Sequence, residues 1–174
     1  AFWKAIVQGK SGVDRIKSFD TSEYDTKIAA EVSDFDPLNY MAKSVAKRVD
    51  RFAQFGIASA KMAIEDAKLD LGKENKDRIG VCMGSGLGGV IFHEEQIEIM
   101  YRKGPQSAHP LGVPKVAPNA VPGHISIELG LKGPNIAIST ACSSGSHAVG
   151  QAFYMIRLGK ADVMVAGGAE APIT

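Results

Sequence analysis

The central junction of this chain reads IAISTACSSGSHAV, residues 136–149. Its opening apolar run predicts a short buried strand that stops at Ser139 and Thr140, and a helix is predicted to begin at once. Cys142 therefore lies at or beside a helix N-terminus, where unpaired N–H groups and the helix dipole lower a thiol pKa. Because the thiolate is the nucleophilic form of cysteine, the junction favours covalent acyl chemistry at Cys142.

Composition places the chain among ordinary globular domains. Its 174 residues are 45% hydrophobic and 22% charged, and the formal net charge of +1 gives no sign of a nucleic-acid-binding protein. No apolar run reaches the roughly 20 residues that a membrane helix needs, and no signal peptide is visible. We therefore expect a cytoplasmic protein that binds neither nucleic acid nor a membrane.

The two cysteines are expected to lie in different environments. Cys82 and Cys142 are far apart in the sequence and form no CxxC pair, so no metal site is expected and a disulfide has little support. Cys82 lies inside the apolar run IGVCMG and is expected to be a buried core thiol.

Helical and strand-like segments alternate along the chain. Strands are predicted at 78–84, 135–139 and 161–167, and helices at 88–103, 120–129 and 142–158. An earlier helical stretch, 40–71, is expected to break into two segments near Gly56. This order predicts an α/β fold whose buried strands are parallel or mixed.

Both ends of the chain suggest a fragment. The first 40 residues are polar and irregular, and we expect surface loops there with one short element at most. No opening strand is predicted, and the chain stops at GGAEAPIT, directly after a predicted core strand. Three apolar strands alone would leave hydrophobic sheet edges uncovered, so we expect a single domain truncated at both ends.

A glycine-rich motif follows the first predicted strand. GSGLGG, residues 84–89, matches the GxGxxG fingerprint of dinucleotide-binding folds in a strand-to-helix setting. That fingerprint also needs a second parallel strand after the helix, whereas this helix runs into the proline-rich segment 104–123. We therefore expect a tight turn rather than a nicotinamide or flavin site, with Leu87 projecting as a pocket wall.

The residues alone leave Cys142 open to two interpretations, an activated nucleophile or a small buried side chain at a strand–helix corner. Ser143 and Ser144 are rival nucleophiles, but the stretch lacks the GxSxG pattern, and we expect them to satisfy N–H groups of the first helical turn. The Cys142 backbone N–H is one candidate oxyanion donor. His147 is expected to cap or pack, because five residues correspond to roughly 140° around a helix.

A longer run, GPNIAISTACSSGSHAVGQAFYMIRLGKADVMVAGGAE (residues 133–170), resembles the active-site segment of β-ketoacyl-[acyl-carrier-protein] synthases of the thiolase superfamily. The similarity extends upstream through YMAKSVAKRVDRFAQFGIASAKMAIEDA, RIGVCMGSGLGG and NAVPGHISIELGLKGP. It is strongest to the type II elongating enzymes of bacterial fatty-acid synthesis. Modular polyketide synthases usually carry a third serine where this chain has Gly145.

The resemblance implies a thiolase-like αβαβα layered fold, of which this chain holds the N-terminal half without its first strand. It implies a homodimer in which the strand at 135–139 pairs with its symmetry mate, and acyl carrier protein as partner. It assigns the acyl-accepting nucleophile to Cys142. A malonyl-carrier thioester then decarboxylates, and its carbanion attacks the acyl-enzyme to give a 3-oxoacyl product. No cofactor is implied, because phosphopantetheine arrives on the carrier protein.

Further residues are assigned by their positions in the family. Leu87 matches the residue at the foot of the acyl pocket, and Gly112 and Val113 match residues that reach the partner subunit's pocket. Lys47 and Arg48 fall in a basic stretch that in relatives faces the acidic carrier protein. A solvated helix face is the other interpretation of these two cations, and the sequence leaves both open.

The leading prediction is a 3-oxoacyl-[acyl-carrier-protein] synthase, an acyltransferase. The family's two catalytic histidines, second oxyanion donor and gating phenylalanine belong to a C-terminal half that this sequence lacks, so we expect this chain alone not to complete the condensation. The alternatives are a catalytically incomplete fragment, a non-catalytic ketosynthase partner, a thiolase or a polyketide ketosynthase. Cys142 argues against a non-catalytic partner, in which the nucleophile is typically replaced.

Overall fold

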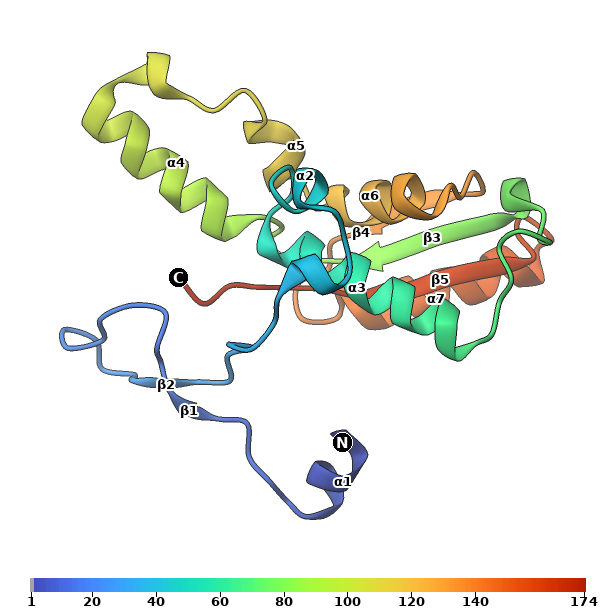
Figure 1. Cartoon of the computed structure of the whole chain (residues 1–174), viewed down its shortest axis with the longest axis horizontal. Helices are drawn as coiled ribbons and strands as arrows, with labels where there is room; N and C mark the ends of the chain where they lie inside the picture. The colour runs from blue at the N-terminus through green and yellow to red at the C-terminus, as the bar shows by residue number, and fades with distance from the viewer. Residues whose placement is uncertain (1) are drawn as a thin grey trace. The chain divides into compact units, whose positions relative to one another are not determined.

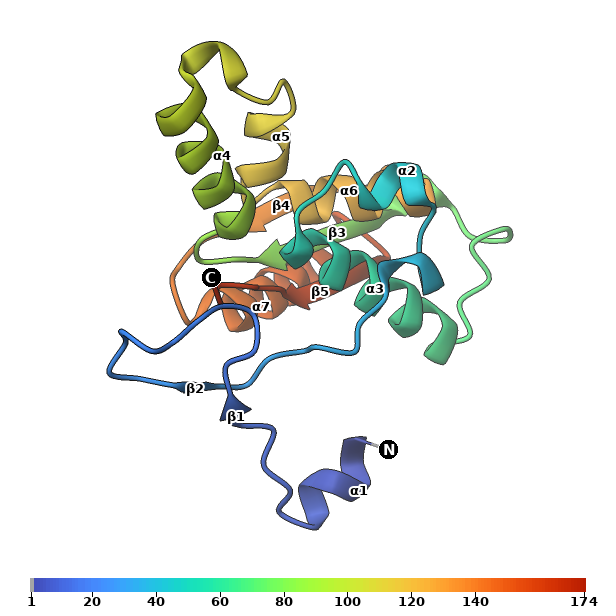
Figure 2. The ribbon, with the colours of Figure 1, turned by 60° about the vertical axis from the view of Figure 1, so that its left-hand side comes forward.

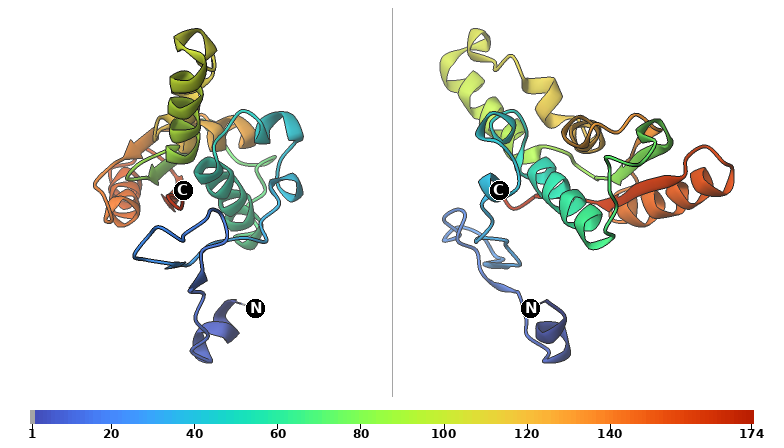
Figure 3. Two further views of the ribbon diagram at one scale, coloured as in Figure 1. Left: turned by 90° about the vertical axis from the view of Figure 1, so that its left-hand side faces the viewer. Right: turned by 45° about the vertical axis from the view of Figure 1, so that its right-hand side comes forward.

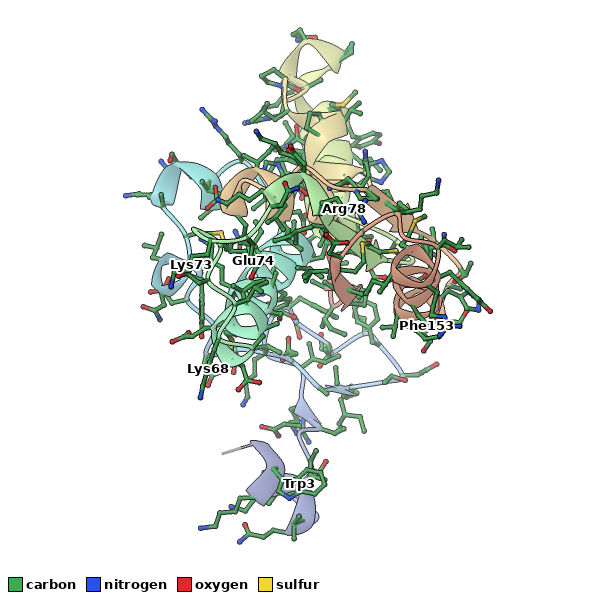
Figure 4. The ribbon with its side chains drawn as sticks, turned by 90° about the vertical axis from the view of Figure 1, so that its right-hand side faces the viewer. Trp3, Lys68, Lys73, Glu74, Arg78 and Phe153 are labelled. Carbon is green, nitrogen blue, oxygen red and sulfur yellow. The ribbon has the colours of Figure 1, made fainter. Side chains whose placement is uncertain are left out.

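The computed structural model describes residues 2–174, which form two separate units (Figure 1). The smaller unit runs up to Phe35 and includes Ile173–Thr174. It contains α1 (Phe2–Val7) and the antiparallel pair β1 (Asp14–Arg15) and β2 (Ile28–Ala29). The sequence led us to expect one short element at most in this region, and the strand pair corrects that expectation. Figure 4 marks Trp3, an exposed side chain of α1.

The larger unit, Asp36–Pro172, contains the predicted alternation of helices and strands. Its elements, in chain order, are η1 (Pro37–Asn39), α2 (Lys43–Ala46), α3 (Arg51–Asp66), η2 (Lys76–Arg78), β3 (Ile79–Gly84), α4 (Val90–Lys103), η3 (Pro105–Ser107), α5 (Gly112–Val116), α6 (Ala120–Leu129), β4 (Asn135–Ile138), α7 (Ser144–Arg157) and β5 (Val163–Gly168). None of the helices that the structure describes is long and apolar enough to cross a membrane.

The sheet of the larger unit has the strand order β4-β3-β5, and both pairings are parallel. Cys82 in the middle of β3 lies opposite Ile136 of β4 and Ala166 of β5. All six residues of β3 are buried, as expected for a central strand with helices on both faces. The carboxyl ends of the three strands therefore meet at one edge of the sheet.

Helices cover both faces of this sheet (Figure 2; Figure 3, left). On one face, α6 contacts β3 while α3 contacts α6 and β5, and the main hydrophobic core there includes Ile79, Val81 and Met83 of β3. On the other, α7 packs Ala148 and Ala152 against Cys82. Successive β3 side chains point to opposite faces, so one strand supplies both cores. The burial of Cys82 confirms the core thiol that the sequence predicts.

The predicted helix break near Gly56 is wrong. α3 runs unbroken through Gly56, and the chain breaks earlier, between α2 and Asp50, whose carboxylate caps α3 by accepting from the Phe52 N–H at 3.3 Å. A Cβ at Gly56 would collide with the Val121 side chain of α6. This glycine therefore permits close helix packing instead of ending a helix.

The helix that follows Cys142 leaves several apolar side chains exposed. They are Val149, Phe153, Tyr154, Ile156 and Leu158. Figure 4 labels Phe153 on the outside of α7, and its ring is 57% exposed. α7 therefore packs against the sheet through small alanines and presents larger apolar side chains to its surroundings.

Candidate active site

A pocket of about 520 Å³ opens where the three parallel strands end. The residues that line it leave β3, begin α7 and leave β5: Gly84, Ser85, Gly86, Leu87, Ala141, Cys142, Ser144, Gly145, Gly168, Ala169 and Glu170. Ligands of parallel α/β sheets commonly bind at this carboxyl edge. The pocket thus brings Cys142 and Leu87 together, two residues that the sequence analysis singled out.

Cys142 is exposed, which excludes the interpretation of a small buried side chain. Ser143 is the N-cap residue of α7, and Cys142 directly precedes it. The residue before Cys142, Ala141, has a φ of 51°, in the left-handed region that a non-glycine residue rarely adopts. The chain thus turns sharply between β4 and α7 and presents the thiol at the pocket.

Close backbone packing holds the start of α7 against the strand ends. A Cβ at Gly84 would collide with the backbone of Ser144, and a Cβ at Gly168 would lie 3.0 Å from the Cα of Gly145. Glycine at the ends of β3 and β5 therefore lets the first turn of α7 approach the sheet directly. Gly145, which also has no side chain, lies against the backbone of Gly168 in this contact.

Ser143 and Ser144 do not satisfy the first N–H groups of α7, so that expectation is wrong. The Ser143 hydroxyl donates to the Thr140 carbonyl at 2.7 Å, and the Ser144 hydroxyl donates to the Ala141 carbonyl at 2.6 Å. The Ser144 oxygen also accepts from the Thr140 N–H at 2.8 Å. Both hydroxyls thus stabilise the turn that carries Cys142, and Ser144 is buried.

Glu170, which the sequence analysis did not single out, organises the opposite wall of the pocket. Its Oε2 accepts from the N–H groups of Gly86 at 2.5 Å and Leu87 at 3.3 Å, and its Oε1 accepts from the Ser85 hydroxyl at 3.1 Å. The Ser85 oxygen accepts in turn from the Gly88 N–H at 3.0 Å. The sequence signal that could have indicated Glu170 is its position in GGAE, directly after a strand that ends at the same sheet edge as β3.

These contacts explain the GxGxxG match. The N–H groups that would bind a phosphate in a dinucleotide site bind a carboxylate of the same chain. The structure also continues from α4 into η3 and α5 rather than into a parallel strand. The motif is therefore a tight turn, as expected, and Leu87 is 60% exposed on the pocket wall.

No histidine among the described residues lines this pocket. His147 lies exposed on α7, and its Nδ1 is 2.7 Å from the Thr140 hydroxyl in the turn before the helix. His124 lies on α6, where burial is the main cause that lowers the pKa of its imidazole. Nor do the described residues contain a group of three or more metal-binding side chains.

Gly112 and Val113 lie away from Cys142, at a second pocket of about 360 Å³ between α4 and α5. Val113 is 80% exposed there, and the neighbouring walls are the side chains of Phe92, Met100 and His109. Within this chain the two predicted acyl-pocket regions are thus separate. Their role toward a partner subunit stays a prediction.

Lys47 and Arg48 are both exposed, directly after α2. The Lys115 ammonium of α5 donates to the Lys47 carbonyl at 3.2 Å and lies 4.2 Å from the centre of the Phe92 ring. A third cation therefore lies beside the two predicted ones. Their exposure leaves both interpretations of this stretch open, a docking surface and a solvated helix end.

A sharp turn at the carboxyl edge of a parallel sheet thus presents an exposed cysteine to a pocket. The model of the family described as "Beta-ketoacyl synthase, N-terminal domain" matches residues 1–174, and the chain belongs to this family. The family that the sequence predicted is thereby confirmed.

Two curated relatives from different bacteria carry the same name. The chain is 47% identical over 168 residues to the 3-oxoacyl-[acyl-carrier-protein] synthase 2 of Vibrio cholerae, covering 97% of this chain and 41% of the relative. It is 41% identical over 172 residues to the enzyme of the same name from Staphylococcus aureus, covering 99% of this chain and 43% of the relative. The chain thus spans about two-fifths of the length of these relatives.

Solved ketosynthases share the fold. The ishigamide ketosynthase/chain length factor matches with a TM-score of 0.87 at 27% identity, over 97% of this chain and 42% of that one. A β-ketoacyl synthase from Burkholderia phymatum matches with a TM-score of 0.82 at 28% identity, over 97% of this chain and 42% of that one. Their thiolase-type layered fold is the one that the sequence predicted.

Proposed function

We propose that this chain supplies the nucleophile and one pocket wall of a 3-oxoacyl-[acyl-carrier-protein] synthase in fatty-acid elongation. The observation that carries the proposal is the exposed Cys142, held on a sharp turn in a pocket that Leu87 also lines. The relatives at 41% and 47% identity bear this enzyme name. The chain is, in this proposal, the N-terminal half of such an enzyme, and the exposed apolar side of α7 supports a further layer.

The proposed reaction begins at the sulfur of Cys142. Its thiolate attacks the thioester carbonyl of an acyl-carrier protein, a C–S bond forms to Cys142, and the carrier's phosphopantetheine leaves as a thiolate that takes up a proton. The Cys142 backbone N–H serves as one oxyanion donor, at the point where the carbonyl oxygen becomes negative. Leu87 then lies against the bound acyl chain.

Condensation follows in the proposed cycle. A malonyl-carrier thioester loses CO₂, and the resulting carbanion attacks the acyl-enzyme carbonyl to form a carbon–carbon bond. The Cys142 sulfur leaves as a thiolate, which restores the nucleophile and releases a 3-oxoacyl-carrier protein. The residues that promote decarboxylation lie, in this proposal, outside the present chain.

The proposed partners are acyl carrier protein and a second copy of the enzyme. Lys47 and Arg48 are exposed cations suited to an acidic carrier. One solved neighbour, matching over 80% of this chain and 40% of that one with a TM-score of 0.75 and 28% identity, is described as a type II polyketide acyl-carrier protein in complex with its ketosynthase. β4 pairs only with β3 in the described sheet, which supports pairing of its other side across a dimer. A cytoplasmic location remains part of the proposal.

The test is turnover in a chimera in which this chain replaces the matched 168 residues of the Vibrio cholerae relative. Incubated with acyl- and malonyl-carrier protein, the chimera should release CO₂ and form a 3-oxoacyl-carrier protein. The same chimera with Cys142→Ala should form none. A chimera that melts cooperatively but gives no Cys142-dependent product would contradict the proposal.

A further inference from the structure

We propose that Glu170 is a positioning residue that sets which acyl chains Cys142 accepts, by fixing residues 85–88 (the 85–88 loop) as one wall of the pocket. The inference rests on the acyl-transfer function proposed above and assigns a role to a residue outside the reacting atoms. The Glu170 carboxylate, which follows β5, forms hydrogen bonds to the residues that follow β3.

Glu170 holds the 85–88 loop from a distant part of the sequence. Gly86, whose N–H it accepts, lies 84 residues away from it along the chain. Its two oxygens together receive the N–H groups of Gly86 and Leu87 and the hydroxyl of Ser85. Hydrogen bonds to a carboxylate are stronger than bonds between neutral groups, so Glu170 restrains this loop more firmly than a neutral acceptor would.

Ser85 extends the restraint through the remainder of the loop. Its side chain is 4% exposed, and its hydroxyl donates to Glu170 while accepting from the Gly88 N–H. The N–H groups of Gly86, Leu87 and Gly88 are thus tied, directly or through Ser85, to one carboxylate, while the Ser85 N–H donates to the Ile138 carbonyl at 3.1 Å. Losing that carboxylate frees the N–H groups of Gly86 and Leu87 in particular.

Leu87 is the side chain whose position depends on this restraint. It is 60% exposed and lines the same pocket as Cys142, while its backbone N–H is one of the groups bound by Glu170. An acyl chain attached to Cys142 must fit the space that Leu87 bounds. A shift of such a pocket wall changes discrimination between chains that differ in length, by about ten- to a hundredfold per contact.

Glutamine weakens this restraint. Its amide oxygen can accept from the Gly86 and Leu87 N–H groups and its NH₂ group can donate to the Ser85 oxygen, but the amide is neutral, so these hydrogen bonds lose the strength that the carboxylate charge gives them. Glu170→Gln therefore loses part of the restraint with little change in shape. Glu74→Gln, at an exposed carboxylate on the turn after α3, removes the same charge away from the pocket and is the matched control.

The experiment measures Cys142 acylation by mass spectrometry in the chimera described above, with hexanoyl- and dodecanoyl-carrier protein as separate donors. We expect Glu170→Gln to change the ratio of the two rates by about tenfold, and Glu74→Gln to leave it unchanged. The rate with iodoacetamide, which needs no acyl pocket, should stay within about twofold in both variants. Amide hydrogen exchange at Gly86 and Leu87 should accelerate only in Glu170→Gln.

The outcomes separate the two proposals. If the unaltered chimera is acylated and Glu170→Gln keeps its chain-length ratio, the positioning role is overturned while the proposed function stands. A changed pH dependence of iodoacetamide labelling in Glu170→Gln would instead make Glu170 a base for the thiol, which also overturns positioning. If the unaltered chimera takes up neither acyl group, the proposed function fails and the selectivity role fails with it; hydrogen exchange then still reports whether Glu170 restrains the loop.

Discussion

The Asp50 carboxylate accepts a 2.8 Å hydrogen bond from the backbone N–H of Phe92, and so joins the N-termini of two helices. Its other oxygen accepts from Phe52 in the first turn of α3. Phe92 lies in the first turn of α4, whose own N-cap, Gly89, has no side chain to offer. One buried carboxylate therefore caps its own helix and a second one that follows the 85–88 loop.

Asp50→Ala removes both caps at a site that is 5% exposed. We expect the free energy of unfolding to fall by about 2 kcal/mol or more, since two N–H groups lose their acceptor inside the protein. Urea denaturation measures it. Asp36→Ala is the control, because Asp36 caps only the exposed η1 through Leu38, and it should cost about 1 kcal/mol or less. Equal costs for both variants would contradict the double cap.

Gly84→Ala tests the close packing of α7 on the strand ends. The added methyl group would collide with the backbone of Ser144, so the start of α7 must move, and we expect a loss of about 1 to 3 kcal/mol. Gly150→Ala adds the same methyl group in the middle of α7, where nothing lies within 4 Å. That variant should gain about 0.5 to 1 kcal/mol in stability. Urea denaturation should thus give opposite signs; a harmless Gly84→Ala would contradict this packing.

The two cysteines should differ in reactivity. Cys82 is fully buried in β3, and burial raises the pKa of its thiol, whereas Cys142 is exposed at the start of α7. In the folded chain at neutral pH, iodoacetamide should therefore label Cys142 well before Cys82, as followed by peptide mapping. After unfolding in urea the two rates should converge. Equal rates in the folded protein would contradict the exposure of Cys142 and the burial of Cys82.

An ion pair at the other end of the sheet gives a pH prediction. Arg78 donates to Asp162 at 2.7 Å, and its hydrogen bond lowers the pKa of the Asp162 carboxyl. The stabilisation is therefore present above the pKa of an unfolded aspartate, about 3.9, and is lost as the pH falls through the lower folded value.

Asp162→Asn should then be less stable than the parent near neutral pH and approach it in acid. Urea denaturation across the acidic range measures the difference, with Glu74→Gln as a control away from the pair. Because the pair is exposed, salt should also reduce the difference. A difference independent of both pH and salt would assign the effect to something other than this pair.

The local sequence pattern predicted those helices and strands whose limits are set by neighbouring residues. The strand at 79–84 and the helix at 120–129 follow from apolar runs bounded by glycine, proline and charge, and the structure places them as expected. The helix break was misplaced because Gly56 is required for close packing against Val121, a residue far away in the sequence. Periodicity carries no information about such contacts.

The residues of the site also fall into those that the sequence could reveal and those that only the tertiary structure reveals. Cys142 could be found because a strand, a cysteine and a helix are neighbours in the sequence. Glu170 could not, because its role depends on parallel strands that bring residues 84 positions apart to one edge. The hydroxyl of Ser144 was expected to cap a helix, but the left-handed turn at Ala141 offers it a carbonyl instead. Tertiary geometry thus decided the roles of Glu170 and Ser144.

The most direct test of the account is the intact mass of the chain after incubation with an acyl-carrier-protein thioester, followed by peptide mapping. We expect one acyl adduct, located on Cys142, and none on a Cys142→Ala variant. An adduct on Ser143, Ser144 or Cys82, or acylation that survives Cys142→Ala, would contradict the claim that Cys142 is the nucleophile of this pocket.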